Sequence, residues 1–224
     1  MDNARLFAID RRAFPVAFNS NPLVVSALTM GQSVLQKTYQ LDDLISPRGE
    51  LERRCNSIER FTSRFGPEVR FEFKAGTLTR ISQRLLGGVS LRKFAPEQRD
   101  QLASLIDAAH ASKLVHGDIG PKNLIIAQGT LRVVDWEPCL RQVIGGEIRF
   151  VVSPPCHHPT DRRTASITVL TDLMGLALLW PGQTAISASR FATAALNESR
   201  ESPAAALALA LDRQGGQKAG IERG

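Results

Sequence analysis

Apolar and polar residues alternate in short runs along the first 90 positions, and such runs predict β-strands. The runs are separated by turn-forming residues and lie at 14–18, 23–28, 33–40, 69–73 and 78–86. Between the third and fourth runs, apolar residues recur every three or four positions, which predicts an amphipathic helix over 47–65. Ser46 and Pro47 are typical of a helix N-terminus, and Gly66 is typical of a helix end. We therefore expect a small antiparallel sheet with one helix.

From residue 96 onward, the pattern becomes mainly helical. Helices are predicted at 96–113, 167–180, 189–196 and from 203 to about 211. Two short apolar runs, 124–127 and 131–134, are separated by Gln128 and Gly129 and predict a hairpin. The segment 138–161 is expected to be irregular, and the Gly-rich end at 214–224 is expected to be disordered. The fold class expected from these patterns is α+β.

Polar residues lie on either side of the predicted hairpin. The run 116–118 reads His-Gly-Asp, Asn123 follows Asp118 by five positions, and Asp135 follows Asn123 by twelve. This arrangement resembles the catalytic core of the protein-kinase-like superfamily, in which a His-x-Asp loop and an Asn precede a strand pair and an acidic residue. The Asp-Trp-Glu at 135–137 makes the chain more similar to aminoglycoside and choline phosphotransferases and RIO-type kinases than to eukaryotic protein kinases.

The resemblance spans about residues 14–180 and implies a two-lobed protein-kinase-like fold. It places a small antiparallel N-lobe with one helix at 1–88, a reduced and mainly helical C-lobe at 89–213, and a disordered tail at 214–224. It also implies ATP as cofactor, with Mg²⁺ or Mn²⁺, and transfer of the γ-phosphoryl group to an alcohol.

Each residue of the motif has a role that the resemblance implies. Asp118 would orient the acceptor hydroxyl or accept its proton, and His116 would brace the loop. Lys122 would reach the transferred phosphate or an acidic group of the substrate. Asn123 and Asp135, at the two ends of the hairpin, would supply the oxygen ligands that Mg²⁺ prefers. If Asp118 and Asn123 merely capped turns, the position of Asp135 would have no explanation.

For the nucleotide, the resemblance implies a lysine on the third strand, and Lys37 lies in the middle of that run. A glutamate of the following helix is expected to pair with this lysine. Glu52 is preferred because it lies near the apolar stripe, and Glu50 is the alternative. Leu86, in the link between the lobes, and Leu124, after the catalytic loop, are expected to line the adenine site, although core packing is the safer interpretation of Leu124.

Other positions leave alternatives open. Asp172 lies in a Thr-Asp-Leu-Met-Gly run that resembles a helix of the kinase family. The resemblance implies that Asp172 hydrogen-bonds to the backbone of the catalytic loop, and a helix N-cap or a surface acid is the alternative. Glu137 is either a metal-facing carboxylate or an exposed loop acid. The turn at 19–22 reads Asn-Ser-Asn-Pro and lacks the glycines that let backbone N–H groups approach phosphates, which keeps a nucleotide-binding pseudokinase in view. His157 and His158 lack two further ligands at the spacing of a zinc site.

Composition changes this picture little. The net charge is +6, and 22 arginines and only 6 lysines supply the positive charge. The basic residues form no run longer than Arg-Arg, so nucleic acid is not favoured as a partner. The three cysteines are scattered, which fits a reducing compartment, either the cytoplasm or a host cell that receives a secreted bacterial effector. No apolar stretch is long enough for a membrane span, and a monomer is expected.

The spacing of the motif bears on the substrate. Only 27 residues separate Gly88 from His116, and 44 follow Trp180. The small-molecule enzymes of the superfamily use longer segments at both places to enclose their substrates. We therefore expect a minimal Ser/Thr protein kinase that acts on a protein hydroxyl. A small-molecule phosphotransferase of the aminoglycoside or choline type is the alternative.

Overall fold

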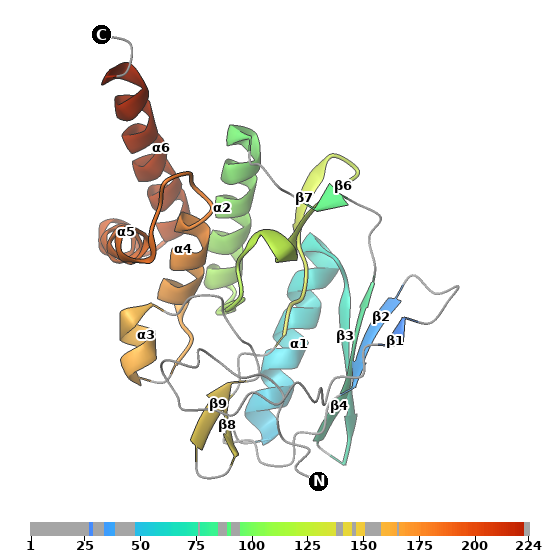
Figure 1. Cartoon of the computed structure of the whole chain (residues 1–224). Coiled ribbons are helices and arrows are strands. Elements are labelled where there is room, and N and C mark those ends of the chain that lie inside the picture. Colours follow the sequence, from blue (N-terminus) through green and yellow to red (C-terminus); the bar gives the residue numbers. More distant parts are fainter. Residues whose placement is uncertain are drawn as a thin grey trace. The chain divides into compact units, whose positions relative to one another are not determined.

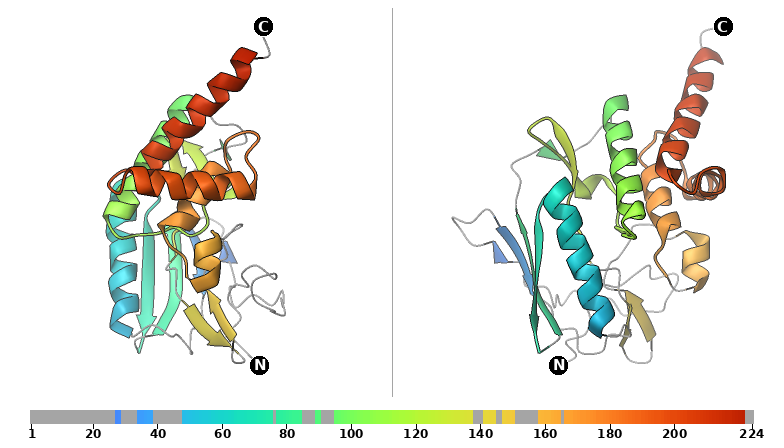
Figure 2. Two further views of the ribbon diagram at one scale, coloured as in Figure 1. Left: turned by 90° about the vertical axis from the view of Figure 1, so that its left-hand side faces the viewer. Right: turned by 180° about the vertical axis from the view of Figure 1, so that it is seen from behind.

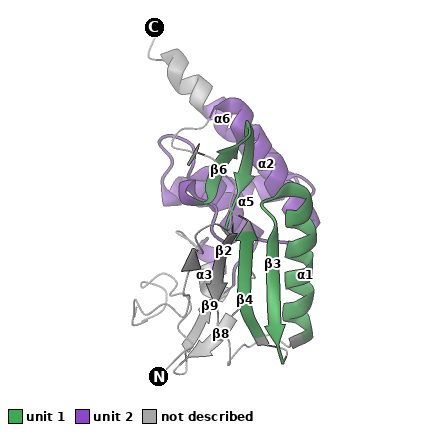
Figure 3. Cartoon of the chain, turned by 90° about the vertical axis from the view of Figure 1, so that its right-hand side faces the viewer, with its two compact units in different colours: residues 1–90, 123–154 green, residues 91–122, 155–224 purple. Residues whose placement is uncertain are grey.

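The computed structural model describes residues 27–28, 34–38, 48–75, 77–84, 89–90, 95–137, 141–144, 147–150, 158–164 and 166–221. The chain forms two compact units, which are described separately below (Figure 3). The first unit comprises residues 1–90 and 123–154, and the second comprises residues 91–122 and 155–224. Among the helices in the described part of the chain, none is long and apolar enough to cross a membrane.

An antiparallel sheet and one helix form the main part of the first unit (Figure 1). The sheet has the order β1-β2-β4-β3 and consists of β1 (Ala27–Leu28), β2 (Val34–Thr38), β3 (Val69–Lys74) and β4 (Thr77–Arg84). Helix α1 (Arg48–Phe65) packs against β3 (Figure 2). The predicted helix is confirmed because its stripe is buried: Leu51, Cys55, Ile58 and Phe61 are each 5% exposed or less.

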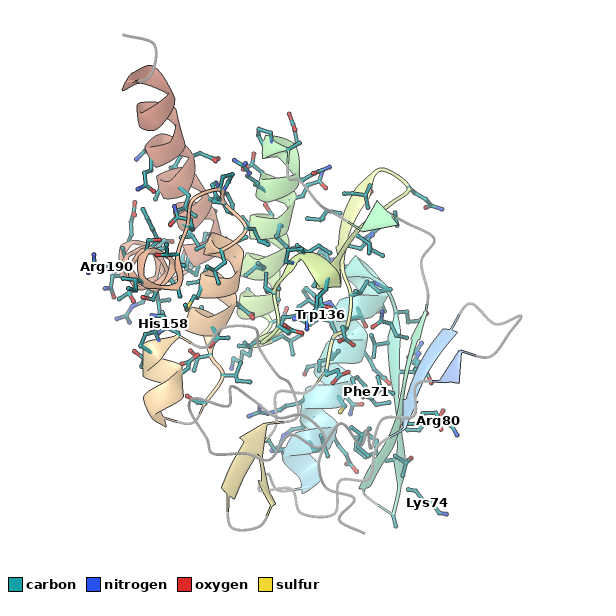
Figure 4. The ribbon with its side chains drawn as sticks, in the orientation of Figure 1. Phe71, Lys74, Arg80, Trp136, His158 and Arg190 are labelled. Carbon is teal, nitrogen blue, oxygen red and sulfur yellow. The ribbon has the colours of Figure 1, made fainter. Side chains whose placement is uncertain are left out.

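The predicted hairpin belongs to the first unit and is also confirmed. It consists of β6 (Leu124–Ala127) and β7 (Thr130–Val133), and the short strand β5 (Val89–Ser90) pairs with β6. Two contacts join the hairpin to the C-terminal half of α1. The Arg132 guanidinium donates to the backbone carbonyl of Phe65 at 2.8 Å. The ring of Trp136 lies 5.0 Å from the ring of Phe61, beside α1 (Figure 4).

The expectation of an irregular segment at 138–161 is wrong. It contains a second hairpin of β8 (Arg141–Ile144) and β9 (Glu147–Phe150), and the start of the short helix α3 (Pro159–Thr164). The Gly145-Gly146 pair between two four-residue runs is typical of a tight hairpin turn, so the sequence contains a local signal for this hairpin.

Helices make up most of the second unit. Besides α3, they are α2 (Pro96–Ala111), α4 (Val169–Ala177), α5 (Ala185–Glu198) and α6 (Pro203–Ile221). Helix α4 contacts α2, α5 and α6, and its residues from Thr171 to Ala177 are all buried, so α4 lies at the centre of this unit. The strongly apolar sequence of this segment explains that position. Helix α6 continues to Ile221, so its last turns fall in the segment expected to be a disordered tail.

These elements confirm an α+β chain with a small antiparallel sheet and one helix in its first unit and mainly helices in its second. Several expectations lie outside the described residues. They concern the strand at 14–18, the turn at 19–22, the helix start at Ser46-Pro47, Leu86 and His157.

Candidate functional site

The backbone of the loop at 116–118 is held by a buried carboxylate of the second unit. Asp172, which is 1% exposed on α4, accepts the N–H of His116 at 2.9 Å and the N–H of Gly117 at 2.7 Å. The hydrogen bonds expected for this residue are therefore present. His110 on α2 lies 3.1 Å from the same carboxylate through its Nε2. The loop is thus held by α4, and α2 contacts the carboxylate that holds it.

Asp118 is 6% exposed and lies in a tight local network. Its backbone N–H donates to Nδ1 of His116 at 3.2 Å, a contact that fits a bracing role for the fully buried His116 ring. Lys122 places its Nζ 2.7 Å from Oδ2 of Asp118, while 64% of the lysine side chain remains exposed. This lysine can leave the carboxylate when another partner arrives, because its stem is solvated.

The same loop lies directly against α4 at a glycine. A Cβ at Gly175 would lie 2.7 Å from the backbone oxygen of Ile119, the residue that follows Asp118. Real Cβ atoms do not approach an oxygen so closely, so only glycine allows this contact without a shift of the loop. Gly175 is therefore a positioning residue that the sequence analysis did not single out.

The two expected metal ligands belong to the first unit and lie at the ends of the β6–β7 hairpin. Asn123, 5% exposed, ends a 3₁₀ turn (Pro121–Asn123), and its backbone oxygen accepts the N–H of Val134 at 2.9 Å. Asp135 is the next residue after Val134, so its backbone lies one position along from the residue that faces Asn123 across the hairpin. Asp135 has φ +67°, a left-handed conformation that Asp tolerates better than most residues, and its N–H donates to Oε1 of Gln83 at 2.9 Å.

This pair suits a divalent cation bound together with phosphate groups. An amide oxygen and a carboxylate are hard ligands, and Mg²⁺ is commonly held by one or two such groups together with the phosphates of a nucleotide. No cluster of three or more His, Cys, Asp or Glu side chains that could hold a metal occurs in the described part of the chain. Glu137 is 4% exposed, so the expectation of an exposed loop acid is wrong for it.

The structure describes only some of the residues that are expected to contact the nucleotide. Lys37 pairs with Ile81 across the sheet, and its side chain lies outside the described residues. Glu52 is exposed on α1, and Glu50 pairs with Arg54 at 2.5 Å. Leu124 is fully buried on β6. The choice of a glutamate partner for Lys37 stays a prediction.

Three buried polar residues escaped the sequence analysis. Gln83 and His110 contact Asp135 and Asp172 as described, and Asp161 accepts hydrogen bonds from Thr168 and Thr171 beside α4. Each was hidden because its partner lies on another element. His158, at the start of α3, accepts from the N–H of Thr160 and contacts Thr193 of α5, so it has a structural role (Figure 4).

Comparison with solved structures finds a likeness to the kinase domain of Mycobacterium tuberculosis PknI, in a mutant form. The two chains are 19% identical, the match covers 86% of this chain and 94% of that chain, and the TM-score is 0.46. No protein-family model and no curated protein matches the sequence. The functional proposal below is therefore supported by the residues of the chain itself.

Proposed function

We propose that the chain is an ATP- and Mg²⁺-dependent phosphotransferase of the protein-kinase-like type, and that it transfers the γ-phosphoryl group to a serine or threonine hydroxyl of a protein. One observation carries the proposal. Asp172 holds the backbone of the loop that carries Asp118 with two buried hydrogen bonds, to the N–H groups of His116 and Gly117. A loop that served only as a turn would not require such an arrangement.

The residues divide the work in a way that fits phosphoryl transfer. Asp118 would accept the proton of the acceptor hydroxyl or orient that hydroxyl for in-line attack, and the developing negative charge would be met by Lys122. Asn123 and Asp135 would hold the metal ion, which neutralises charge on the phosphate oxygens when bound. Lys37 would contact the phosphates of the nucleotide that lie nearer the ribose.

A protein substrate is favoured because the connection between Gly88 and His116 is short, at 27 residues. In the described part of the chain, the segment between β5 and His116 contains one helix, α2. Little chain is left there to enclose a small substrate. An alcohol of low molecular weight is the second candidate acceptor, and the experiment below separates the two.

The test measures incorporation of label from [γ-³²P]ATP with Mg²⁺, with and without a proteome extract and with a panel of small alcohols. The variants are Asp118→Ala and Asp135→Ala, and Asp100→Ala on the exposed face of α2 is the matched control. We expect the wild type and Asp100→Ala to label protein. We expect Asp118→Ala to be slower by a factor of about 10² to 10⁴, the usual contribution of a positioned base.

Each other outcome has a distinct meaning. Label that persists in both Asp118→Ala and Asp135→Ala would refute the assignment. Label that appears only with an added alcohol would replace the protein substrate by a small one. Nucleotide binding without any transfer would indicate a pseudokinase.

A further inference from the structure

Gln83 occupies an unusual place for a polar side chain. It lies on β4, a central strand that is paired with β2 on one side and β3 on the other, and it is 9% exposed. The neighbouring inward positions of the sheet are apolar, with Ile81 at 3% and Val69 at 0% exposure. A buried amide in such surroundings weakens the sheet core unless it makes hydrogen bonds, so its partner is informative.

That partner is the backbone of the proposed metal ligand. Oε1 of Gln83 accepts the N–H of Asp135 at 2.9 Å, across 52 positions of sequence. Asp135 is the second residue after β7, which ends at Val133, and it has φ +67°, so the β6–β7 ladder no longer fixes its peptide. The Gln83 oxygen therefore accepts the Asp135 N–H in the way that a backbone carbonyl of a neighbouring strand would.

Two further contacts of the same unit limit how the Asp135 peptide can move. The N–H of Val134 donates to the Asn123 carbonyl, and the indole N–H of Trp136 donates to the carbonyl of Val133 at 3.1 Å. The residues before and after Asp135 are therefore anchored to the hairpin, and Gln83 is the anchor that comes from the four-stranded sheet.

We propose that Gln83 is a positioning residue for Asp135, and that its amide oxygen fixes the backbone from which the metal-binding carboxylate projects. The inference rests on the proposed function, because it assigns Asp135 to a metal ion. Partners in the shell around a metal ligand contribute strongly to affinity, since they fix the orientation of the ligand. In this proposal the sheet fixes the peptide of Asp135 through Gln83, and the peptide in turn sets the direction of the carboxylate.

The test uses three variants of the full chain. Gln83→Met removes the acceptor at nearly constant volume, and Gln83→Glu keeps an oxygen acceptor at the same reach. Arg80→Met is the matched control, because it places the same residue on the same strand at a side chain that is 43% exposed. Two quantities are measured: hydrogen exchange of the Asp135 amide by NMR, and Mn²⁺ binding by EPR titration in the presence of a non-hydrolysable ATP analogue.

We expect faster exchange of the Asp135 amide and a rise of about tenfold in the Mn²⁺ dissociation constant for Gln83→Met. In Gln83→Glu, both the exchange rate of the Asp135 amide and the Mn²⁺ dissociation constant are expected to stay close to those of the wild type. Arg80→Met is expected to change neither quantity. If Gln83→Met loses its cooperative unfolding transition, Gln83→Asn, which is too short to reach Asp135, is expected to give the same rise.

Unchanged Mn²⁺ affinity in a folded Gln83→Met or Gln83→Asn variant would overturn the inference, whatever its amide exchange. In that case the wild type would still bind Mn²⁺ and transfer phosphate, so the proposed function would stand. A wild type that binds no Mn²⁺ with the nucleotide analogue would overturn the proposed function and this inference together.

Discussion

Replacement of Asp172 by Asn tests how the loop at 116–118 is held. The carboxylate is 1% exposed and accepts from Gly117 through Oδ1 and from His116 through Oδ2, with His110 also at Oδ2. An asparagine has one accepting oxygen. In its best orientation, that oxygen keeps the Gly117 N–H, the amide nitrogen faces His110, and the buried N–H of His116 loses its acceptor.

The magnitude follows from these losses. A buried N–H without an acceptor costs about 1–3 kcal/mol, and the change from a charged to a neutral acceptor at Gly117 costs about 1 kcal/mol more. We therefore expect Asp172→Asn to lower the free energy of unfolding of the second unit by about 2–4 kcal/mol. The transfer rate of the folded fraction is expected to fall as well, because the loop that carries Asp118 is less well fixed.

The two tryptophans allow the unit to be observed separately. Trp180 belongs to the second unit and is 6% exposed, whereas Trp136 belongs to the first. In a Trp136→Phe background, urea unfolding followed by tryptophan fluorescence reports on Trp180 alone. The matched control is Asp107→Asn, since Asp107 also accepts two backbone N–H groups, those of Ala204 and Ala205 at 2.8 and 3.0 Å.

Asp107 lies on α2 and caps the start of α6, where the Ala205 N–H is exposed and water can replace its acceptor, so Asp107→Asn is expected to cost about 1 kcal/mol. An equal decrease in the free energy of unfolding in Asp172→Asn and Asp107→Asn would show that burial of the His116 N–H does not raise the cost of losing its acceptor. A loss below about 1 kcal/mol in Asp172→Asn would show that the loop finds another acceptor, and the reasoning would be refuted.

Three other substitutions test the surrounding structure. Gly175→Ala is expected to destabilise the second unit by about 1–2 kcal/mol in urea unfolding, because the clash with the Ile119 backbone outweighs the gain of about 1 kcal/mol in helix propensity. Arg132→Met is expected to cost about 1–2 kcal/mol in the same assay, because the Phe65 carbonyl loses its charged donor. Cys55→Ala is expected to remove a pH dependence: burial, with Glu59 and Glu52 adding, raises the pKa of the Cys55 thiol far above its ordinary value of 9.0. The wild type should therefore lose about 1.4 kcal/mol more than Cys55→Ala between pH 8 and pH 10.

The sign of the pH effect is fixed by which state ionises. Below pH 9 the thiol is protonated in both states, and above it only the unfolded chain gains by losing the proton. Parallel stability curves for wild type and Cys55→Ala would contradict the burial of this thiol. A stabilised Gly175→Ala variant, or an Arg132→Met variant as stable as the wild type, would likewise contradict the contacts assigned to those side chains.

The elements that could be predicted from the sequence are those with a regular periodicity or a characteristic motif spacing. The stripe of α1 and the hairpin after Asn123 follow from local periods, and the contact between Asp172 and the loop follows from a resemblance between motifs. The hairpin at β8 and β9 was missed although its Gly-Gly signal is local, because the adjacent prolines and the lack of a longer period favoured an irregular segment.

Gln83, His110 and Gly175 could not be found in this way. Their roles depend on partners 52, 62 and 56 positions away, on elements whose packing is decided by the whole unit. A glutamine in a strand or a histidine on a helix is compatible with many folds, so the residue type alone carries no information about such a contact. The spacing of the motif predicts the groups proposed to meet a substrate, and it does not identify the groups that hold them.

The supporting contacts share one physical feature. Asp172 in the second unit and Gln83 in the first each direct a buried side-chain oxygen at backbone N–H groups, rather than at the carboxylates of Asp118 or Asp135. A contact to the carboxylate itself would compete with a proton or a metal ion for the same lone pairs. A hydrogen bond to the peptide instead limits where the carboxylate can project and does not itself occupy the carboxylate oxygens, so a residue that positions the site need not take part in its chemistry.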